Sequence, residues 1–299
     1  MIIGSRGSQL ALWQARWVQA RLPGAEVVVI QTTGDRILDV ALPQAVPQTG
    51  IKGLFTKEIE EALLDRRVDL AVHSLKDLPT QMDPRLVIAA VPAREDVRDA
   101  VVGRRLAELA PGARIGTSSL RRASQLRRLR PDLKVENIRG NVDTRLRKLD
   151  EGRCDALILA AAGLRRLGLA GRIAELLEPE VMCPAIGQGA LAIQCRAEDG
   201  ETRRLLEPLE DPAARAEVEA ERAMLEQLGG GCLVPIGGWA VLRGSQLSLT
   251  GLVASPDGSE VVRASLDGPA SDPADLGRRA AQQLLDRGAG RILDLVHAP

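Results

Sequence analysis

Short apolar runs alternate with amphipathic stretches over the first two-thirds of the chain, and this alternation restricts the fold more than any other feature. The apolar runs are rich in Val, Ile and Leu, which is typical of strands. They cover residues 26–31, 68–72, 86–91, 114–116, 134–138 and 156–160. Apolar residues at helical spacing occupy 56–66, 119–130 and 142–151. Strands that alternate with helices form βαβ units, so the pattern predicts an α/β fold.

Breaks in this pattern divide the chain into candidate domains, and 299 residues suit two or three of them. The breaks lie at 92–99, which is polar, and at 178–184 and 207–212, which each contain two prolines. A strand is expected after the second break, at 190–194. The elements expected after the third break are a helix at 213–228, strands near 241, at 247–252 and at 261–266, and a helix at 275–286. The C-terminal part therefore resembles a small α+β domain.

Aromatic and cysteine residues exclude several classes of protein. Trp13, Trp17, Trp239 and Phe55 are the only aromatics, so stacking platforms for single-stranded nucleic acid are missing. The four cysteines are scattered, form no C-x-x-C pair and, with two histidines, give no zinc pattern, which indicates free thiols of a reducing cytosol. Residues 1–10 do not resemble a signal peptide, and the apolar runs are too short to span a membrane. We expect a cytoplasmic protein with no metal, nucleic-acid or membrane partner.

Basic residues are concentrated in one segment, although the net charge of the chain is zero. Residues 114–172 contain fifteen Lys and Arg against six Asp and Glu, which suits either a ligand with several carboxylates or a solvated basic face. Two motifs there, GTSSLRR (116–122) and IRGNVDTR (138–145), each join a strand to a helix. Helix N-terminal N–H groups and guanidinium groups both bind anions, so the motifs favour a carboxylate ligand.

Two further motifs contain reactive side chains. In AVHSLKDLPT (71–80), Lys76 and Asp77 follow a strand, where α/β proteins bind ligands. Asp77 could move a proton or stabilise a cation, or the two residues could form a surface ion pair, and His73 is expected to be structural. In GGGCLVPIGG (229–238), the glycines leave the thiol of Cys232 accessible to a large group, or Cys232 is a small buried hydrophobe in a glycine-rich loop.

Motifs along nearly the whole chain, in order, resemble those of the porphobilinogen deaminase (hydroxymethylbilane synthase) family. They are GSRGSQLALWQA (4–15), TTGDRILD (32–39), KGLFTKEIEEALL (52–64), AVHSLKDLPT (71–80), GTSSLRRASQL (116–126), IRGNVDTRL (138–146), DALILAAAGLRRLGL (155–169), PAIGQGALAIQCR (184–196) and GGGCLVPIGG (229–238). The departures are Gln194, where the family often has glutamate, and Ile51, where glycine is common.

The resemblance implies an α/β fold of two type II periplasmic-binding-protein-like domains joined by a double crossover hinge, plus a small C-terminal α+β domain. Domain 1 would cover residues 1–94 and 188–208, domain 2 residues 95–187, and domain 3 residues 209–299.

The resemblance also implies a transferase of tetrapyrrole and heme biosynthesis. A dipyrromethane cofactor would be held by a thioether to Cys232, and four porphobilinogen molecules would be added to it with loss of ammonia before hydroxymethylbilane is released. Asp77 would stabilise the cationic stage of each addition. Neutral charge and the lack of a large apolar patch suggest a monomer.

The remaining site residues implied by the resemblance bind carboxylates, line the cleft or cover it. Those expected to contact the acetate and propionate groups are Arg6, Ser8, Lys76, Ser119, Arg121, Arg122, Arg139, Arg145 and Arg166. Thr117, Gly163 and Gln188 would line the cleft, and Lys52 and Phe55 would belong to a mobile lid over residues 42–56. The alternative is a solute-binding protein of the same two-domain architecture, against which the third domain and its cysteine loop argue.

Overall fold

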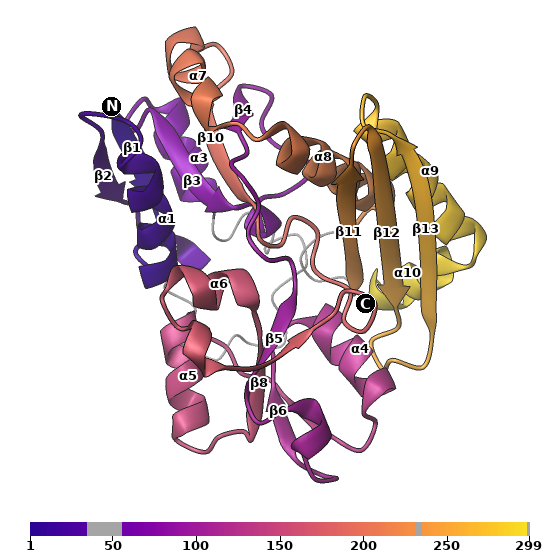
Figure 1. Cartoon of the computed structure of the whole chain (residues 1–299). Coiled ribbons are helices and arrows are strands. Elements are labelled where there is room, and N and C mark those ends of the chain that lie inside the picture. Colours follow the sequence, from indigo (N-terminus) through magenta and orange to yellow (C-terminus); the bar gives the residue numbers. More distant parts are fainter. Residues whose placement is uncertain (35–55, 231–234, 298–299) are drawn as a thin grey trace. The chain divides into compact units, whose positions relative to one another are not determined.

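The computed structural model describes residues 1–34, 56–230 and 235–297. These residues form two compact units (Figure 1). Unit 1 contains residues 1–94 and 190–215, and unit 2 contains residues 95–189 and 216–299. The chain therefore passes from unit 1 to unit 2, returns, and leaves unit 1 again within one helix, α8 (Pro212–Gln227).

Unit 1 is built on a five-stranded sheet with the order β2-β1-β3-β10-β4. Its strands are β1 (Ile2–Ser5), β2 (Glu26–Val29), β3 (Leu70–Ser74), β4 (Leu86–Ala90) and β10 (Leu191–Arg196). Its helices are α1 (Gln9–Gln19), α3 (Lys57–Leu64), the 3-10 turn η2 (Leu75–Asp77), α7 (Gly200–Leu206) and the 3-10 turn η5 (Glu207–Leu209).

The double crossover is confirmed by the place of β10 in this sheet. Strand β10 returns to unit 1 after a long excursion and lies between β3 and β4, antiparallel to both. Its residues are all buried, as expected for a central strand. The register sets Gln194 opposite Ala71 and Ala192 opposite His73, so Gln194 and His73 lie diagonally on one face.

The first sheet of unit 2 has the order β7-β6-β8-β5-β9. Its strands are β5 (Asp99–Gly103), β6 (Arg114–Gly116), β7 (Lys134–Glu136), β8 (Ala156–Ala160) and β9 (Ile173–Leu177). The helical segments are η3 (Leu106–Glu108), α4 (Leu120–Leu129), α5 (Val142–Asp150), α6 (Ala161–Arg166) and η4 (Ala170–Arg172).

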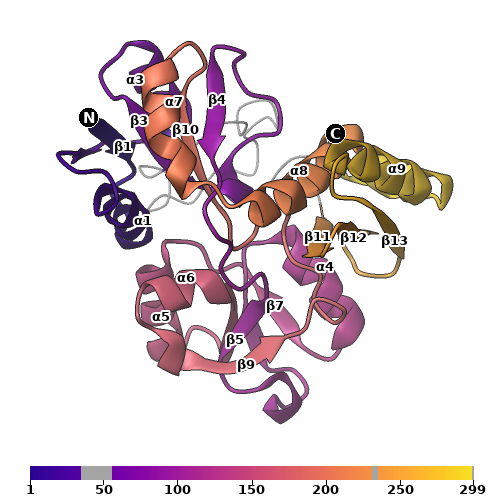
Figure 2. The ribbon, with the colours of Figure 1, turned by 45° about the horizontal axis from the view of Figure 1, so that its top comes forward.

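Helices cover both faces of this sheet. Leu126 of α4 packs with Val101 and Ile158 on one face, and Leu146 of α5 packs with Leu157 in the other cluster. Figure 2 shows α4 on one side of β5, and α5 and α6 on the other. The sequence expectation of βαβ units with two covered faces is therefore confirmed.

The second sheet of unit 2 is antiparallel and has the order β11-β12-β13. Its strands are β11 (Ile236–Arg243), β12 (Gln246–Ala254) and β13 (Val261–Pro269), and helices α9 (Pro273–Asp286) and α10 (Ala289–His297) follow. Met224 of α8 packs so closely on Gly238 and Gly251 that a Cβ at either glycine would collide with it. The α8 helix and α9 share one core with this sheet (Figure 1).

Each of the three sheets lies within one of the three predicted domains, whose boundaries stay a prediction. Within unit 2, the turn after β12 packs on α4: Ser124 Oγ lies 3.4 Å from the carbonyl oxygen of Pro256. Gly258 has φ +78°, and a side chain there would meet the backbone of Ser124. No helix among the described residues is long and apolar enough to cross a membrane.

Candidate functional site

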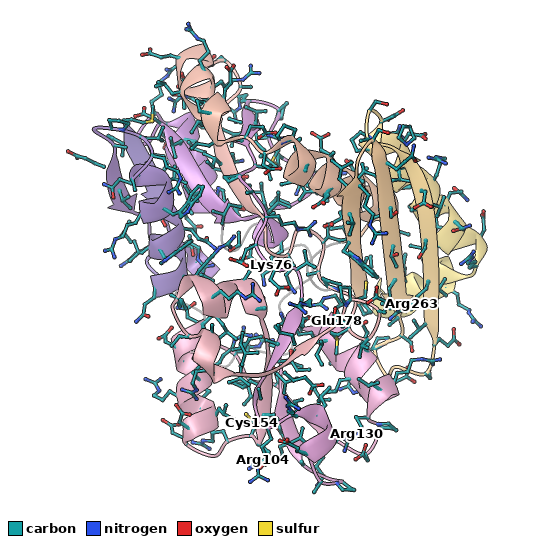
Figure 3. The ribbon with its side chains drawn as sticks, in the orientation of Figure 1. Lys76, Arg104, Arg130, Cys154, Glu178 and Arg263 are labelled. Carbon is teal, nitrogen blue, oxygen red and sulfur yellow. The ribbon has the colours of Figure 1, made fainter. Side chains whose placement is uncertain are left out.

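Four predicted site residues of unit 1 lie at one edge of its sheet. Strands β1 and β3 are parallel, so their carboxyl ends meet at this edge. Arg6 follows β1, and Ser8 caps α1 by accepting a hydrogen bond at 3.3 Å from the backbone N–H of Ala11. Lys76, which is labelled in Figure 3, and Asp77 lie in η2 after β3. Asp77 is exposed.

Buried contacts hold the turn that carries Asp77. The amide of Gln14, which is 2% exposed, donates to Ser74 Oγ at 2.8 Å. The backbone N–H of Leu75 donates to the carbonyl of Ala190 at 3.0 Å. Neither Gln14 nor Ser74 was identified from the sequence, because a polar residue inside an amphipathic helix gives no signal of its distant partner.

Three polar side chains, of which His73 and Gln194 are buried and Glu60 is partly exposed, are linked by hydrogen bonds in the same unit. His73 Nε2 lies 3.0 Å from Gln194 Oε1, and Gln194 Nε2 donates to Glu60 Oε1 at 3.1 Å. Burial lowers the pKa of His73 to about 4, against the opposing effects of Gln194 and Asp77. His73 is therefore a neutral side chain at physiological pH, in agreement with its expected structural character.

The predicted anion motifs of unit 2 gather at one edge of its first sheet. Strands β6, β7 and β8 are mutually parallel, so the segments that follow them share this edge. Ser119 caps α4 after β6, and Thr117 Oγ1 accepts from the N–H of Ser119 at 3.2 Å. Arg139 lies exposed after β7, and Gly163 is buried in α6 after β8.

Two more predicted arginines of this edge are held by backbone carbonyls. Arg145 Nε donates to Gly140 O at 2.7 Å across the turn before α5. Arg166 Nη2 donates to Gly189 O at 2.6 Å, and burial lowers the pKa of Arg166 to about 10. Arg166 therefore keeps its charge at neutral pH. It is hydrogen-bonded to Gly189, at the end of the segment that leaves unit 2.

Arg121, Arg122 and Gln188 meet at one fully buried carboxylate, Asp99. Arg121 Nη1 donates to Asp99 Oδ2 at 2.8 Å, and Arg122 Nε and Nη2 donate to Oδ1 at 3.0 and 2.7 Å. Gln188 Nε2 donates to Oδ1 at 2.9 Å. Both arginines are buried as well, with 4% and 5% of their surface exposed.

The two neighbouring arginines differ in their hydrogen bonds. Arg122 also donates to a β8 carbonyl and to Gln188, so it is occupied within unit 2. Within the described residues, the side-chain hydrogen bonds of Arg121 all come from Nη1, which donates to Asp99 and to the carbonyl of Cys183. Burial opposes ionisation of Asp99, but both guanidinium groups outweigh it and hold the pKa of Asp99 well below its usual range.

Asp99 was not identified from the sequence, where residues 92–99 form a polar break. The usable signal was its position directly before the apolar residues of β5, because a carboxylate at the start of a buried strand needs a cationic partner.

Asp99→Asn is expected to destabilise unit 2 by about 3–5 kcal/mol, because two buried guanidinium groups would lose the one carboxylate that they contact among the described residues. Urea unfolding measures this change. Since the pKa of Asp99 is depressed on folding, its stabilising effect is present at neutral pH and is lost as the pH falls below its unfolded value. The control is Asp132→Asn, which breaks an exposed pair with Arg130 and should change little. Equal stability of both variants would contradict the prediction.

Some predicted residues lie outside the described ones: Cys232, Lys52, Phe55 and all of segment 42–56 except Thr56. The other three cysteines are buried and free. Burial raises the pKa of Cys183 to about 12 and of Cys195 to about 11, and also raises that of Cys154, so all three are poor nucleophiles. The described residues contain no group of three or more His, Cys, Asp or Glu that could hold a metal ion.

Comparison with known proteins covers almost the whole chain. The family model "Porphobilinogen deaminase, dipyromethane cofactor binding domain" matches residues 1–204, and "Porphobilinogen deaminase, C-terminal domain" matches residues 215–286. The porphobilinogen deaminase of Syntrophobacter fumaroxidans is 53% identical over 99% of this chain and 97% of its own length. That of Roseiflexus castenholzii is 54% identical over 98% of both chains.

A solved periplasmic binding protein of Salmonella typhimurium with high arginine specificity aligns with a TM-score of 0.38 and 12% identity, over 72% of this chain and 92% of its own. The two family models and the full-length relatives lead to one assignment: the chain belongs to the porphobilinogen deaminase family.

Proposed function

We propose that Asp77, Cys232 and the arginines at the sheet edge of unit 2 carry out the reaction of this family. That reaction is the stepwise condensation of four porphobilinogen molecules, with loss of ammonia, on a dipyrromethane primer, followed by hydrolytic release of hydroxymethylbilane. The observation that carries the proposal is the exposed Asp77 next to Lys76 in the turn after β3, at the same edge of the sheet as Arg6.

The donors of unit 2 suit the carboxylates of a dipyrromethane. When bound, the group supplies a free pyrrole carbon to which porphobilinogen is joined. The exposed Arg139, Nε and Nη2 of Arg121, and the capped N-terminus of α4 are all cationic or N–H donors at one edge. Guanidinium groups bind carboxylates in a fixed geometry and do not titrate in the working range. Arg145 and Arg166 would complete this set of carboxylate ligands in unit 2, with Ser119 as a hydroxyl donor. In unit 1, Lys76 would bind carboxylates and Ser8 would donate its hydroxyl.

Asp77 would act on the positive charge that develops as ammonia leaves. Its Oδ atoms can accept a pyrrole N–H and lower the energy of that charge, since preorganised charges are among the strongest contributions to catalysis. Gln14 and Ser74 restrict the turn before Asp77, so little reorganisation is needed when the charge forms. Thr117, Gly163 and Gln188, which are buried near this edge, would line the substrate site.

Cys232 would be the attachment point of the cofactor, an assignment that rests on its glycine-rich motif. The buried state of the other three cysteines and their raised pKa values support it, because a thioether needs a reachable sulfur. We include in the proposal the three domain boundaries, a cytoplasmic monomer, and the absence of nucleic-acid and membrane partners, which follow from the cysteine usage, the neutral charge and the scarcity of aromatics.

An intact mass measurement tests the proposal, together with an assay of hydroxymethylbilane formation from porphobilinogen. The mass of active protein is expected to exceed the sequence mass by two linked pyrrole units. Active protein of unmodified mass would contradict both the covalent primer and Cys232 as its anchor.

A further inference from the structure

One short segment of unit 2, residues 183–189, is shared by the two sheets of that unit. It follows β9 and ends where the chain returns to unit 1. Its first residues belong to the core of the C-terminal sheet. Cys183 packs with Leu252 of β12, and Ile186 lies in the same core cluster as Met224 of α8.

The last two residues of the segment contact the arginine edge, which is the edge of the first sheet of unit 2 where the proposed carboxylate ligands lie. Gln188 Nε2 donates at 2.9 Å to Asp99 Oδ1, on the carboxylate that the buried arginines of α4 share. The carbonyl of Gly189 accepts from Arg166 Nη2 at 2.6 Å. A displacement of the first part of the segment would therefore also move the contacts of these ligands.

Glu221 of α8 connects this segment to strand β11. Its side chain is fully buried. Oε2 accepts from the backbone N–H of Gly187 at 2.7 Å, and Oε1 accepts from that of Ala240 in β11 at 2.8 Å. One carboxylate thus holds a helix, a strand and the shared segment together.

The backbone of β11 also lies directly against the segment. Strand β11 is the edge strand of its sheet, and the N–H of Gly238 donates to the carbonyl of Pro184 at 2.9 Å. A Cβ at Gly237 would lie 2.9 Å from Cys183 Sγ, and a Cβ at Gly238 would lie 2.9 Å from Ile186 Cδ1. Both positions need glycine because the two backbones approach so closely.

We propose that Glu221 is a positioning residue that holds the two elements flanking Cys232 at a set distance from the arginine edge that binds the primer. Helix α8 precedes Cys232 in the chain and strand β11 follows it. Both elements are bonded through Glu221 to residues 183–189, which continue into the arginine edge. The proposal rests on the function proposed above for Cys232. A tethered group reaches its ligands only at the right distance, and a misplacement of about 1 Å can lower a rate on the order of 10²-fold.

The substitution Glu221→Gln tests the proposal, because glutamine keeps the shape but has only one accepting oxygen. Its NH₂ group would face the N–H of Gly187 or of Ala240, so one link would be lost. We expect kcat per molecule that carries the two-pyrrole increment to fall about tenfold, with KM for porphobilinogen changed less than about twofold. The effect belongs in kcat because a covalently held primer cannot dissociate.

Intact mass gives the loaded fraction of this variant, and circular dichroism gives the folded fraction. A purely structural role would lower these fractions and leave kcat per loaded molecule at the wild-type value, which would overturn the proposal. The matched control is Glu217→Gln. Glu217 Oε1 accepts from the N–H of Leu242 at 3.0 Å, a bond that also joins α8 to β11 but does not involve residues 183–189. Its kcat should stay within about twofold of wild type, and an equal loss in both variants would contradict the role of the Gly187 link.

Hydrogen exchange of the wild-type holoenzyme tests the link without a variant and without an activity assay. Peptides covering residues 183–189 and 236–243 should exchange slowly and in parallel, because Glu221 binds an N–H group in each. Exchange of 183–189 more than about tenfold faster than that of 236–243 would overturn the proposal, and this result decides even if Glu221→Gln does not fold. Active protein without the mass increment would instead overturn the proposed function, because there would be no tethered primer to position.

Discussion

Asp77→Asn is expected to retain the cofactor and to lower kcat by about 10²–10³-fold, the usual effect of removing one preorganised charge from an active site. Asparagine has the shape of aspartate but cannot stabilise a developing cation by charge. Asp77 is exposed in η2, so its replacement leaves the buried contacts of Gln14 and Ser74 in place. Intact mass reports the cofactor, and single-turnover kinetics report the condensation step.

Asp65→Asn serves as the control for this prediction. Asp65 lies at the C-terminal end of α3 in the same unit, pairs with Arg67 on the surface and is exposed. The Asp65→Asn substitution removes one carboxylate and leaves the sheet edge formed by β1 and β3 unchanged. Turnover of Asp77→Asn close to that of Asp65→Asn would remove Asp77 from the mechanism.

Cys232→Ser is expected to abolish the covalent mass increment completely and, with it, the formation of hydroxymethylbilane. A hydroxyl is a far weaker nucleophile than a thiolate at neutral pH, so the thioether cannot form. The variant should still fold, which circular dichroism and urea unfolding can check. The intact mass of the purified variant, compared with the mass calculated from its sequence, tests this expectation.

Cys154→Ala is the matched control, since it removes a buried thiol from unit 2 and leaves three cysteines in place. It should keep the full increment. A Cys232→Ser protein that carries the increment and remains active would show that the primer is attached elsewhere or is not needed.

Much of the fold was accessible from local sequence. The expected strand at 114–116 is β6, the helix at 119–130 is α4, and the strand at 156–160 is β8. These elements have strong periodicity and clear boundaries, such as Ser119 as the cap of α4. Strands β1, β5 and β9 and helix α1 were not expected, and β5 begins inside the predicted break at 92–99.

The candidate site could be predicted from the sequence only as separate motifs. The sequence identified an edge residue after each parallel strand, such as Asp77 after β3 and Arg139 after β7, because the carboxyl ends of parallel strands meet. The sequence could not distinguish the contacts of Arg121 from those of Arg122, because the two are adjacent in the chain and are the same type of residue. Their difference depends on Asp99, 22 and 23 residues away.

The sequence by itself determined many of the strands and helices, the concentration of positive charge and the family motifs, because these are properties of short stretches of chain. Only the tertiary structure decided which polar groups are buried together. Asp99 meets Gln188 across 89 residues, and His73 meets Gln194 across 121. The second pairing depends on the register of β10 against β3, in which Gln194 lies opposite Ala71. A shift of one residue would turn Gln194 to the other face of the sheet and leave His73 without this hydrogen-bond partner.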